Sequence, residues 1–210
     1  MIATLLFLSL SVTSAHSYYM ILFATQNGDA HLFPDPKTCH NWATWVEVDE
    51  EHNVIEQFNI SWVGHAGVKF LYGPQCPRNL TLVQTLDRAK SRGVCMTMWG
   101  PYCITECCYQ AAKRQYEYLE AAIVNGTAFY IVLDRFTRGK DNCPAFNCIH
   151  AIIGCQGEMV NTHNRIGNAA AEAIIRHYRH KYGIGYYNPA NEWVWDAVRP
   201  EGDYYIQRAD

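Results

Sequence analysis

Apolar and polar residues alternate along two neighbouring segments near the N-terminus, residues 39–48 and 54–63, and the charged stretch DEEHN joins them. Alternation with a period of two, interrupted by such a turn, predicts a β-hairpin. Residues 17–25 are rich in aromatic and β-branched side chains and predict another strand. Two shorter strands are expected at 94–99, where Gly-Pro follows, and at 128–136.

Three longer segments follow the helical period instead. Residues 81–93 begin with Thr81 and Gln84 at the spacing of a capping box, which predicts a helix start. Residues 105–126 and 168–182 each run from an amphipathic pattern into a glycine, so we expect two further helices that end there.

These elements predict one α+β domain, an antiparallel sheet with helices packed on it, over residues 16–210. The apolar stretch 1–15 has the length of a signal peptide and ends in small residues, so we expect export and cleavage after Ala15. Near the C-terminus, Trp193 and Trp195 are expected to pack back onto the body of the domain.

Charge and hydropathy narrow the classes of partner. The formal net charge is −3, which provides no basic field for nucleic acid or for anionic lipid. No segment beyond the N-terminal one approaches the ~18 apolar residues of a membrane span, so stable membrane insertion is not expected. The sequence leaves the oligomeric state open.

Export changes how the nine cysteines are interpreted. In an oxidising compartment most cysteines form disulfides, and an odd number leaves at least one thiol. The simplest prediction is four bridges and one free thiol, with Cys107 and Cys108 in two separate bridges. The nine are Cys39, Cys76, Cys95, Cys103, Cys107, Cys108, Cys143, Cys148 and Cys155.

Cys148 is the strongest candidate for a reactive thiol. It follows a loop and opens the apolar segment CIHAIIGC, where the N–H groups at a helix start would favour a thiolate and stabilise an oxyanion. His150 lies two residues further on and would not face the sulfur on a helix. The base must then come from elsewhere, and His40, at the start of the first hairpin strand, is the candidate.

Pairing in the hairpin supplies a group that would orient His40. If residues 51–52 form the turn, Ser61 lies opposite Trp42 and Asn59 lies opposite Thr44. Ser61 and Asn59 then share the face of His40, and either would serve as the third member of a catalytic triad.

The stretches CHNWATWVEV and FNCIHAI resemble the circularly permuted NlpC-like papain fold, which includes the lecithin:retinol acyltransferase-like enzymes. In that family a strand supplies the histidine and a later helix start supplies the cysteine. The resemblance assigns these positions to His40 and Cys148, and it covers about a third of the chain. Asn41 after the histidine and Ile149-His150-Ala151 after the cysteine depart from the family's pattern.

The resemblance implies an exported thiol hydrolase or acyltransferase in which Cys148 forms an acyl-thioester and His40 acts as base and then as acid. Its substrate would be an amide or ester of a peptide, a cell wall or a lipid, and no metal or organic cofactor is required. The alternative is a non-catalytic, disulfide-rich, secreted binding module on the same fold, in which Cys148 is bridged to Cys143 or Cys155.

Other histidines offer weaker alternatives. His52 lies in the hairpin turn, and His163 precedes the last helix together with Asn164, so each is a possible orienting group. His177 and His180 are three residues apart on the last predicted helix, which is compatible with a zinc pair but more typical of solvated side chains.

Overall fold

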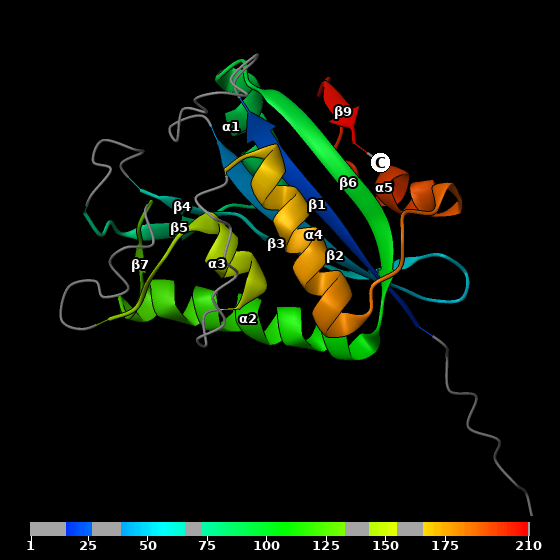
Figure 1. Cartoon of the computed structure of the whole chain (residues 1–210), viewed down its shortest axis with the longest axis horizontal. Coiled ribbons are helices and arrows are strands. Elements are labelled where there is room, and N and C mark those ends of the chain that lie inside the picture. Colours follow the sequence, from blue (N-terminus) through cyan, green and yellow to red (C-terminus); the bar gives the residue numbers. More distant parts are fainter. Residues whose placement is uncertain (1–15, 27–38, 66–72, 133–142, 155–165, 210) are drawn as a thin grey trace, which may run out of the picture.

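The computed structural model describes residues 16–26, 39–65, 73–132, 143–154 and 166–209. Its centre is a five-stranded sheet in the order β3-β2-β1-β6-β9 (Figure 1). The strands are β1 (Ser17–Gln26), β2 (His40–Val48), β3 (Val54–Ile60), β6 (Cys95–Ile104) and β9 (Ile206–Arg208). The pairs are antiparallel except β6–β9, which is parallel, so the sheet is mixed and not purely antiparallel as expected from the sequence.

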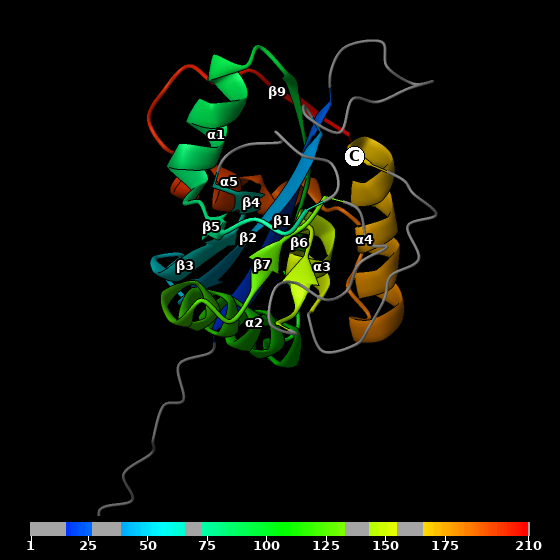
Figure 2. The same ribbon diagram turned by 90° about the vertical axis from the view of Figure 1, so that its left-hand side faces the viewer.

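Helices cover both faces of this sheet, as the view in Figure 2 shows. One face carries α2 (Glu106–Asn125), α3 (Cys148–Ile153) and α4 (Asn168–Tyr182), whose buried side chains join Leu22 and Trp45 in one core cluster. The other face carries α1 (Leu82–Ser91) and α5 (Glu192–Val198), which pack on Phe23 and Trp42. The fold is therefore α+β, as predicted, with a core on each side of the sheet.

The hairpin register agrees with the sequence prediction. Asn59 lies opposite Thr44 and Ile60 lies opposite Ala43, so partner numbers sum to the same value along most of the pair. A shift in register occurs only next to the turn, between Glu47 and Val48. The register is fixed because Phe58 and Ile60 pack in the core cluster on the α2 face, and a slip by one residue would move them to the α1 face and bring Asn59 and Ser61 into that cluster.

Helix boundaries also follow the predicted signals. Thr81 caps α1 in a complete capping box with Gln84. Gly126 and Gly183 stop α2 and α4 in the left-handed conformation that glycine adopts without strain. The tail packs back as expected, since Trp195 is buried against Phe23.

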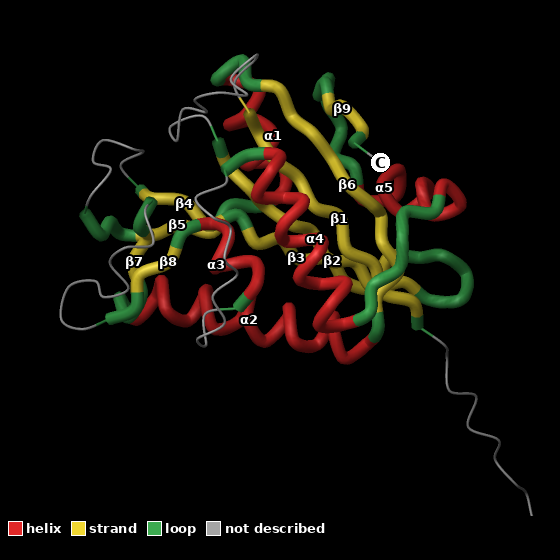
Figure 3. The backbone as a smooth tube through the Cα atoms, viewed as in Figure 1, coloured by secondary structure: helices red, strands yellow, loops and turns green. Residues whose placement is uncertain are grey.

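Several strands differ from expectation (Figure 3). β6 does not end at Gly100-Pro101 but continues to Ile104, with a bulge in its pairing to β1 between Met20 and Leu22. Of the strand expected at 128–136, the described residues hold only β7 (Phe129–Tyr130).

The strand expected at 54–63 is divided into β3 and β4 (Trp62–Gly64), and no sequence pattern predicted the short strands β5 (Pro77–Asn79), β8 (Ala145–Phe146) and β9. β4 pairs with β5, and β7 pairs with β8, so each makes a two-stranded ladder beside the main sheet. Across the described ranges, no helix is both long and apolar enough to span a lipid bilayer. The predicted signal peptide, residues 1–15, lies outside the described residues.

Candidate functional site

His40 begins β2 and faces the side of the sheet that carries α1. Its Nε2 forms a 2.9 Å hydrogen bond with the hydroxyl of Ser61, and its ring stacks on Trp42 at 5.7 Å between centroids. The same side chain lines a small pocket with Thr85 and Arg88 of α1. The position of Ser61 beside His40 is as the hairpin register predicted.

Surrounding groups oppose the protonation of His40. Burial of the imidazole lowers its pKa from 6.5 to about 3, and the positive charges of Arg88 and Arg92 add to the shift. His40 is therefore neutral at physiological pH and remains so well into the acid range.

Asn59 shares the face of His40 but is committed to other partners. Its side-chain oxygen accepts a 2.9 Å hydrogen bond from Thr44, and its amide nitrogen donates to the carbonyl of Leu80 at 2.8 Å. Ser61 is completely buried. Of the two predicted orienting residues, the structure places only Ser61 against His40.

Cys148 is the first residue of α3, as the sequence indicated. The Asn147 side chain caps the helix by accepting a 2.9 Å hydrogen bond from the backbone N–H of His150. Cys148 packs against the core cluster that α2, α3 and α4 form on their face of the sheet. His40 lines its pocket with residues of α1 and stacks on Trp42, which belongs to the other core cluster.

Tyr130 is a neighbour of Cys148 that sequence reasoning missed. Burial raises the pKa of its phenol, and the Cys148 sulfur adds to that effect while Arg88 opposes it. Tyr130 thus lies within electrostatic range of Cys148 and of Arg88, which lines the His40 pocket. The sequence predicted a strand at 128–136, but no pattern indicated that Tyr130 would lie near Cys148.

The remaining histidines do not form a second candidate. His52 lies in the turn at the far end of β2 and stacks on Trp193 at 4.1 Å between centroids, away from His40. His180 is exposed, and His177 lies edge-on to Tyr178. In the part of the chain that the structure describes, no three His, Cys, Asp or Glu side chains gather where they would hold a metal ion. His163 and Asn164 lie outside the described residues.

The disulfide predictions are not reproduced by the structure. No two of the eight described cysteines are joined, and Cys107 and Cys108 are both thiols. Cys108 is buried, which raises the pKa of its thiol to about 12. Cys155, the ninth cysteine, lies outside the described residues, so the predicted four bridges stay a prediction.

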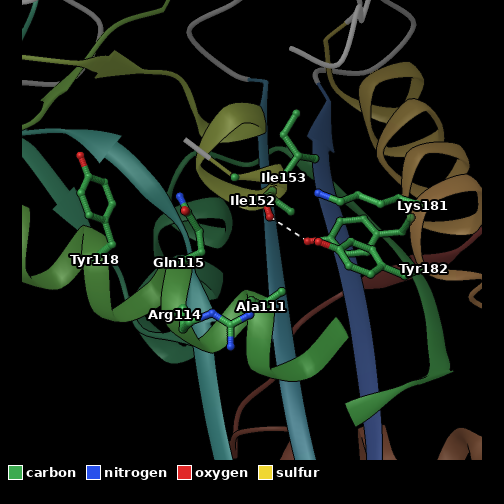
Figure 4. A pocket seen from close by; sticks show the side chains of 11 residues that line it. Ala111, Arg114, Gln115, Tyr118, Ile152, Ile153, Lys181 and Tyr182 are labelled. Carbon is green, nitrogen blue, oxygen red and sulfur yellow. Dashed lines mark hydrogen bonds between the residues drawn. The ribbon is translucent and has the colours of Figure 1, made fainter. Parts of the chain in front are cut away.

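A larger hollow lies on the Cys148 side of the sheet, between α2, α3 and α4 (Figure 4). We call it the helical groove, and its volume is about 330 Å³. It is lined by Ala111, Ala112, Arg114, Gln115, Tyr118, Ile152, Ile153, Gly154, Tyr178, Lys181 and Tyr182. Its volume is at the lower end of the range for pockets that bind small molecules.

Hydrogen bonds from the neighbouring helices hold α3 at the floor of the helical groove. The Tyr178 hydroxyl donates to the carbonyl of Ile152 at 2.8 Å, the dashed line in Figure 4. The Gln115 side chain donates to the carbonyl of Ala151 at 3.2 Å. These contacts satisfy two carbonyls near the C-terminal end of a helix only six residues long. The groove is thus bounded by helices that are tied to one another.

A signal for the groove does exist in the sequence. Ala111, Arg114, Gln115 and Tyr118 follow the i, i+3, i+4, i+7 spacing and form one stripe on α2. The stripe combines a cation, an amide and a phenol with one alanine, which differs from an ordinary core face. No local pattern in the sequence indicated which other helices would lie against this stripe of α2.

Comparison with known proteins adds no assignment, because no family model, no curated protein and no solved structure matches the chain.

Proposed function

We propose that this chain is an exported, non-catalytic binding module whose site is the helical groove. The supporting observation is the groove itself, a hollow of about 330 Å³ with apolar and charged walls. A concave site with an apolar floor and a few polar groups is the usual form of a small-molecule site. The lowered pKa of the buried His40, about 3, also favours binding over thiol catalysis.

Nuclear magnetic resonance titrations test this proposal. Benzyl alcohol, benzylamine and phenyl phosphate serve as neutral, cationic and anionic probes of similar shape. At least one should shift the amide signals of α2, α3 and α4 around the groove in a saturable way. Ala111 lines the groove and Ala121 is exposed elsewhere on α2, so A111W should abolish these shifts and A121W should leave them.

The proposal fails if none of the three probes shifts those signals. It fails equally if A111W, which fills the groove with an indole, leaves a probe's binding unchanged. Comparison of the two tryptophan variants separates loss of the site from a general disturbance of α2.

A thiol hydrolase or acyltransferase on a permuted papain-like fold is the second candidate. One observation favours it: α3, which starts with Cys148, contacts β2, which starts with His40, and this matches the layout of elements in the family that the sequence resembles. Catalysis would require the Cys148 thiol to reach His40, which lines the pocket with α1, or another base.

Hydrolysis of p-nitrophenyl acetate tests the second candidate. An enzyme of this type should release a burst of nitrophenol and carry an acetyl group on Cys148, and C148S should abolish both. C76S, which removes an exposed thiol elsewhere, is the matched control. The binding proposal predicts no burst that depends on Cys148.

A further inference from the structure

Positive charge flanks the helical groove on two sides. Arg114 lines it from α2 and Lys181 lines it from α4, and none of the described lining residues is acidic. Arg114 is exposed and forms no ion pair with any other described residue. Figure 4 shows the Lys181 side chain extending from α4 toward Ile152 and Ile153.

Two helix ends at the groove carry partial charge of the other sign. Gly154 at the end of α3 and Tyr182 at the end of α4 both line it. A helix C-terminus amounts to at most about half a negative charge, and less for a helix as short as α3. The full charge of the exposed Arg114 alone outweighs these contributions, so the groove attracts anions, and Lys181, whose Nζ lies 5.0 Å from the centre of the Tyr182 ring, is a further cation at the rim. A cleft lined by one sign of charge also raises the local concentration of the opposite ion.

The floor of the groove is apolar and aromatic. Ile152, Ile153 and Tyr178 are buried, and the Tyr178 ring lies 5.4 Å from that of Tyr182 between centroids. The Tyr178 hydroxyl already donates to the carbonyl of Ile152, so the ring and not the hydroxyl is available to a ligand. Such a floor favours a flat apolar body, because aromatic rings pack well against each other in offset or tilted geometry.

Size restricts the ligand further. A hollow of about 330 Å³ accommodates a compound of one or two rings rather than a long acyl chain or a folded peptide segment.

We propose that the helical groove binds a small aromatic anion, with its carboxylate or phosphate between Arg114 and Lys181 and its ring over Ile152, Ile153 and Tyr178. This inference rests on the proposed binding function and specifies the chemical class of the ligand. Arg114 provides a planar donor group that pairs with two oxygens of a carboxylate or phosphate, and Lys181 provides a second charge.

Isothermal titration calorimetry at low salt tests the ligand class with phenyl phosphate, benzoate, inorganic phosphate, phenol and benzylamine. Phenyl phosphate and benzoate should bind more tightly than phenol and inorganic phosphate, because only they engage both the charged rim and the ring-binding floor. Benzylamine should bind most weakly.

Variants locate the charge that is responsible. R114Q should weaken phenyl phosphate binding about tenfold, the effect of losing one charge-assisted hydrogen bond of about 1.4 kcal/mol. R114K should retain part of the affinity. Arg176 is exposed on α4, pairs with Glu172 and does not line the groove, so R176Q is the control and should bind as the unaltered chain does.

Three results would overturn the inference. If benzylamine or phenol binds the groove at least as tightly as phenyl phosphate, the ligand is not an anion, although the binding module stands. If inorganic phosphate binds as tightly as phenyl phosphate, the aromatic part is wrong. If R114Q and K181Q both leave phenyl phosphate binding unchanged, these cations do not recognise the ligand. Failure of every probe to bind would remove the proposed function as well.

Discussion

The surroundings of His40 suit a structural histidine better than a general base. A base works best when its pKa lies near the working pH, whereas burial and two arginines lower that of His40 to about 3. Its hydrogen bond to Ser61 joins β2 to the residue that follows β3, and its ring stacks on Trp42 within β2. The residue that most resembled a catalytic histidine in the sequence thus has the contacts of a core residue.

This environment predicts a pH dependence of stability. The unfolded chain binds a proton on His40 near pH 6.5 while the folded chain does not until about pH 3, so stability is complete above 6.5 and falls as the pH decreases between these values. The loss should reach roughly 2 to 3 kcal/mol between about pH 6.5 and 4.5. Urea denaturation across this range measures it, and H40Q should remove that part of the slope.

Gln207 is exposed and carries no titratable group, so Q207A is the control and should keep the pH dependence of the unaltered chain. If the free energy of unfolding of H40Q changes with pH as steeply as that of the unaltered chain, His40 is not held neutral in the folded state.

Three Asn-x-Ser/Thr stretches, beginning at Asn59, Asn79 and Asn125, differ in accessibility. Asn59 is 7% exposed and bonded to Thr44, whereas Asn79 accepts a 2.7 Å hydrogen bond from the N–H of Ser61. Asn125 is exposed at the end of α2. A glycan on either of the first two would displace buried partners, so we expect only Asn125 to carry one in the folded protein.

Secretion from a eukaryotic host, followed by enzymatic removal of N-glycans and mass spectrometry, checks this. N125Q should lose the whole glycan mass. Folded protein with a glycan on Asn59 would contradict the buried position of that strand.

At the scale of elements, the sequence predicted the helix starts and helix ends that depend on interactions between residues close together in the chain. The capping box of α1 is complete in the structure because its bonds link Thr81 and Gln84, which lie only three residues apart. The glycine stops of α2 and α4 are equally local. By contrast, β9 forms only by pairing with β6, more than a hundred residues away, and three residues carry no alternation that reveals it.

The N-cap of α1 allows a direct measurement. Thr81→Ala should lower the free energy of unfolding by about 1 kcal/mol, because the Gln84 N–H loses its acceptor. Thr81→Ser retains the hydroxyl and should cost much less. Urea denaturation compares them, and equal stabilities of the alanine and serine variants would show that the cap contributes little.

The C-terminal helix contributes to the core on the α1 face. Trp195 is buried and its ring lies 5.5 Å from that of Phe23 between centroids. Trp195→Ala should therefore cost about 3 to 5 kcal/mol of stability through the cavity it leaves. Tyr205→Ala, at a residue that is 79% exposed, should have little effect in the same denaturation experiment. Similar losses for both variants would indicate that the tail is not docked.

At the scale of the whole molecule, the sequence predicted the α+β class and the hairpin register, but not which helix covers which face. Periodicity shows that His40, Asn59 and Ser61 share one face of the hairpin. It does not show whether the helix that starts with Cys148 packs on that face or on the opposite one. That choice depends on long connections between elements and on the fit of two cores, which no local pattern records.

The helical groove escaped prediction for a related reason. Each of its walls forms an ordinary helix, and the hollow exists only because α2, α3 and α4 meet on one side of the sheet. The stripe of Arg114 and Tyr118 on α2 was visible in the sequence, but nothing indicated that Lys181 of α4 would lie across from it.

Whether the His40 imidazole activates the Cys148 thiol distinguishes the proposed binding module from a thiol enzyme, and the reactivity of that thiol tests it most directly. Iodoacetamide labelling of Cys148 can be mapped by mass spectrometry from about pH 5 to 9. The binding module predicts the same labelling profile in the unaltered chain and in H40Q, and no label in either if Cys148 is in a disulfide. Labelling near pH 5 to 6 that H40Q abolishes would show that the imidazole activates the sulfur and would contradict the binding module.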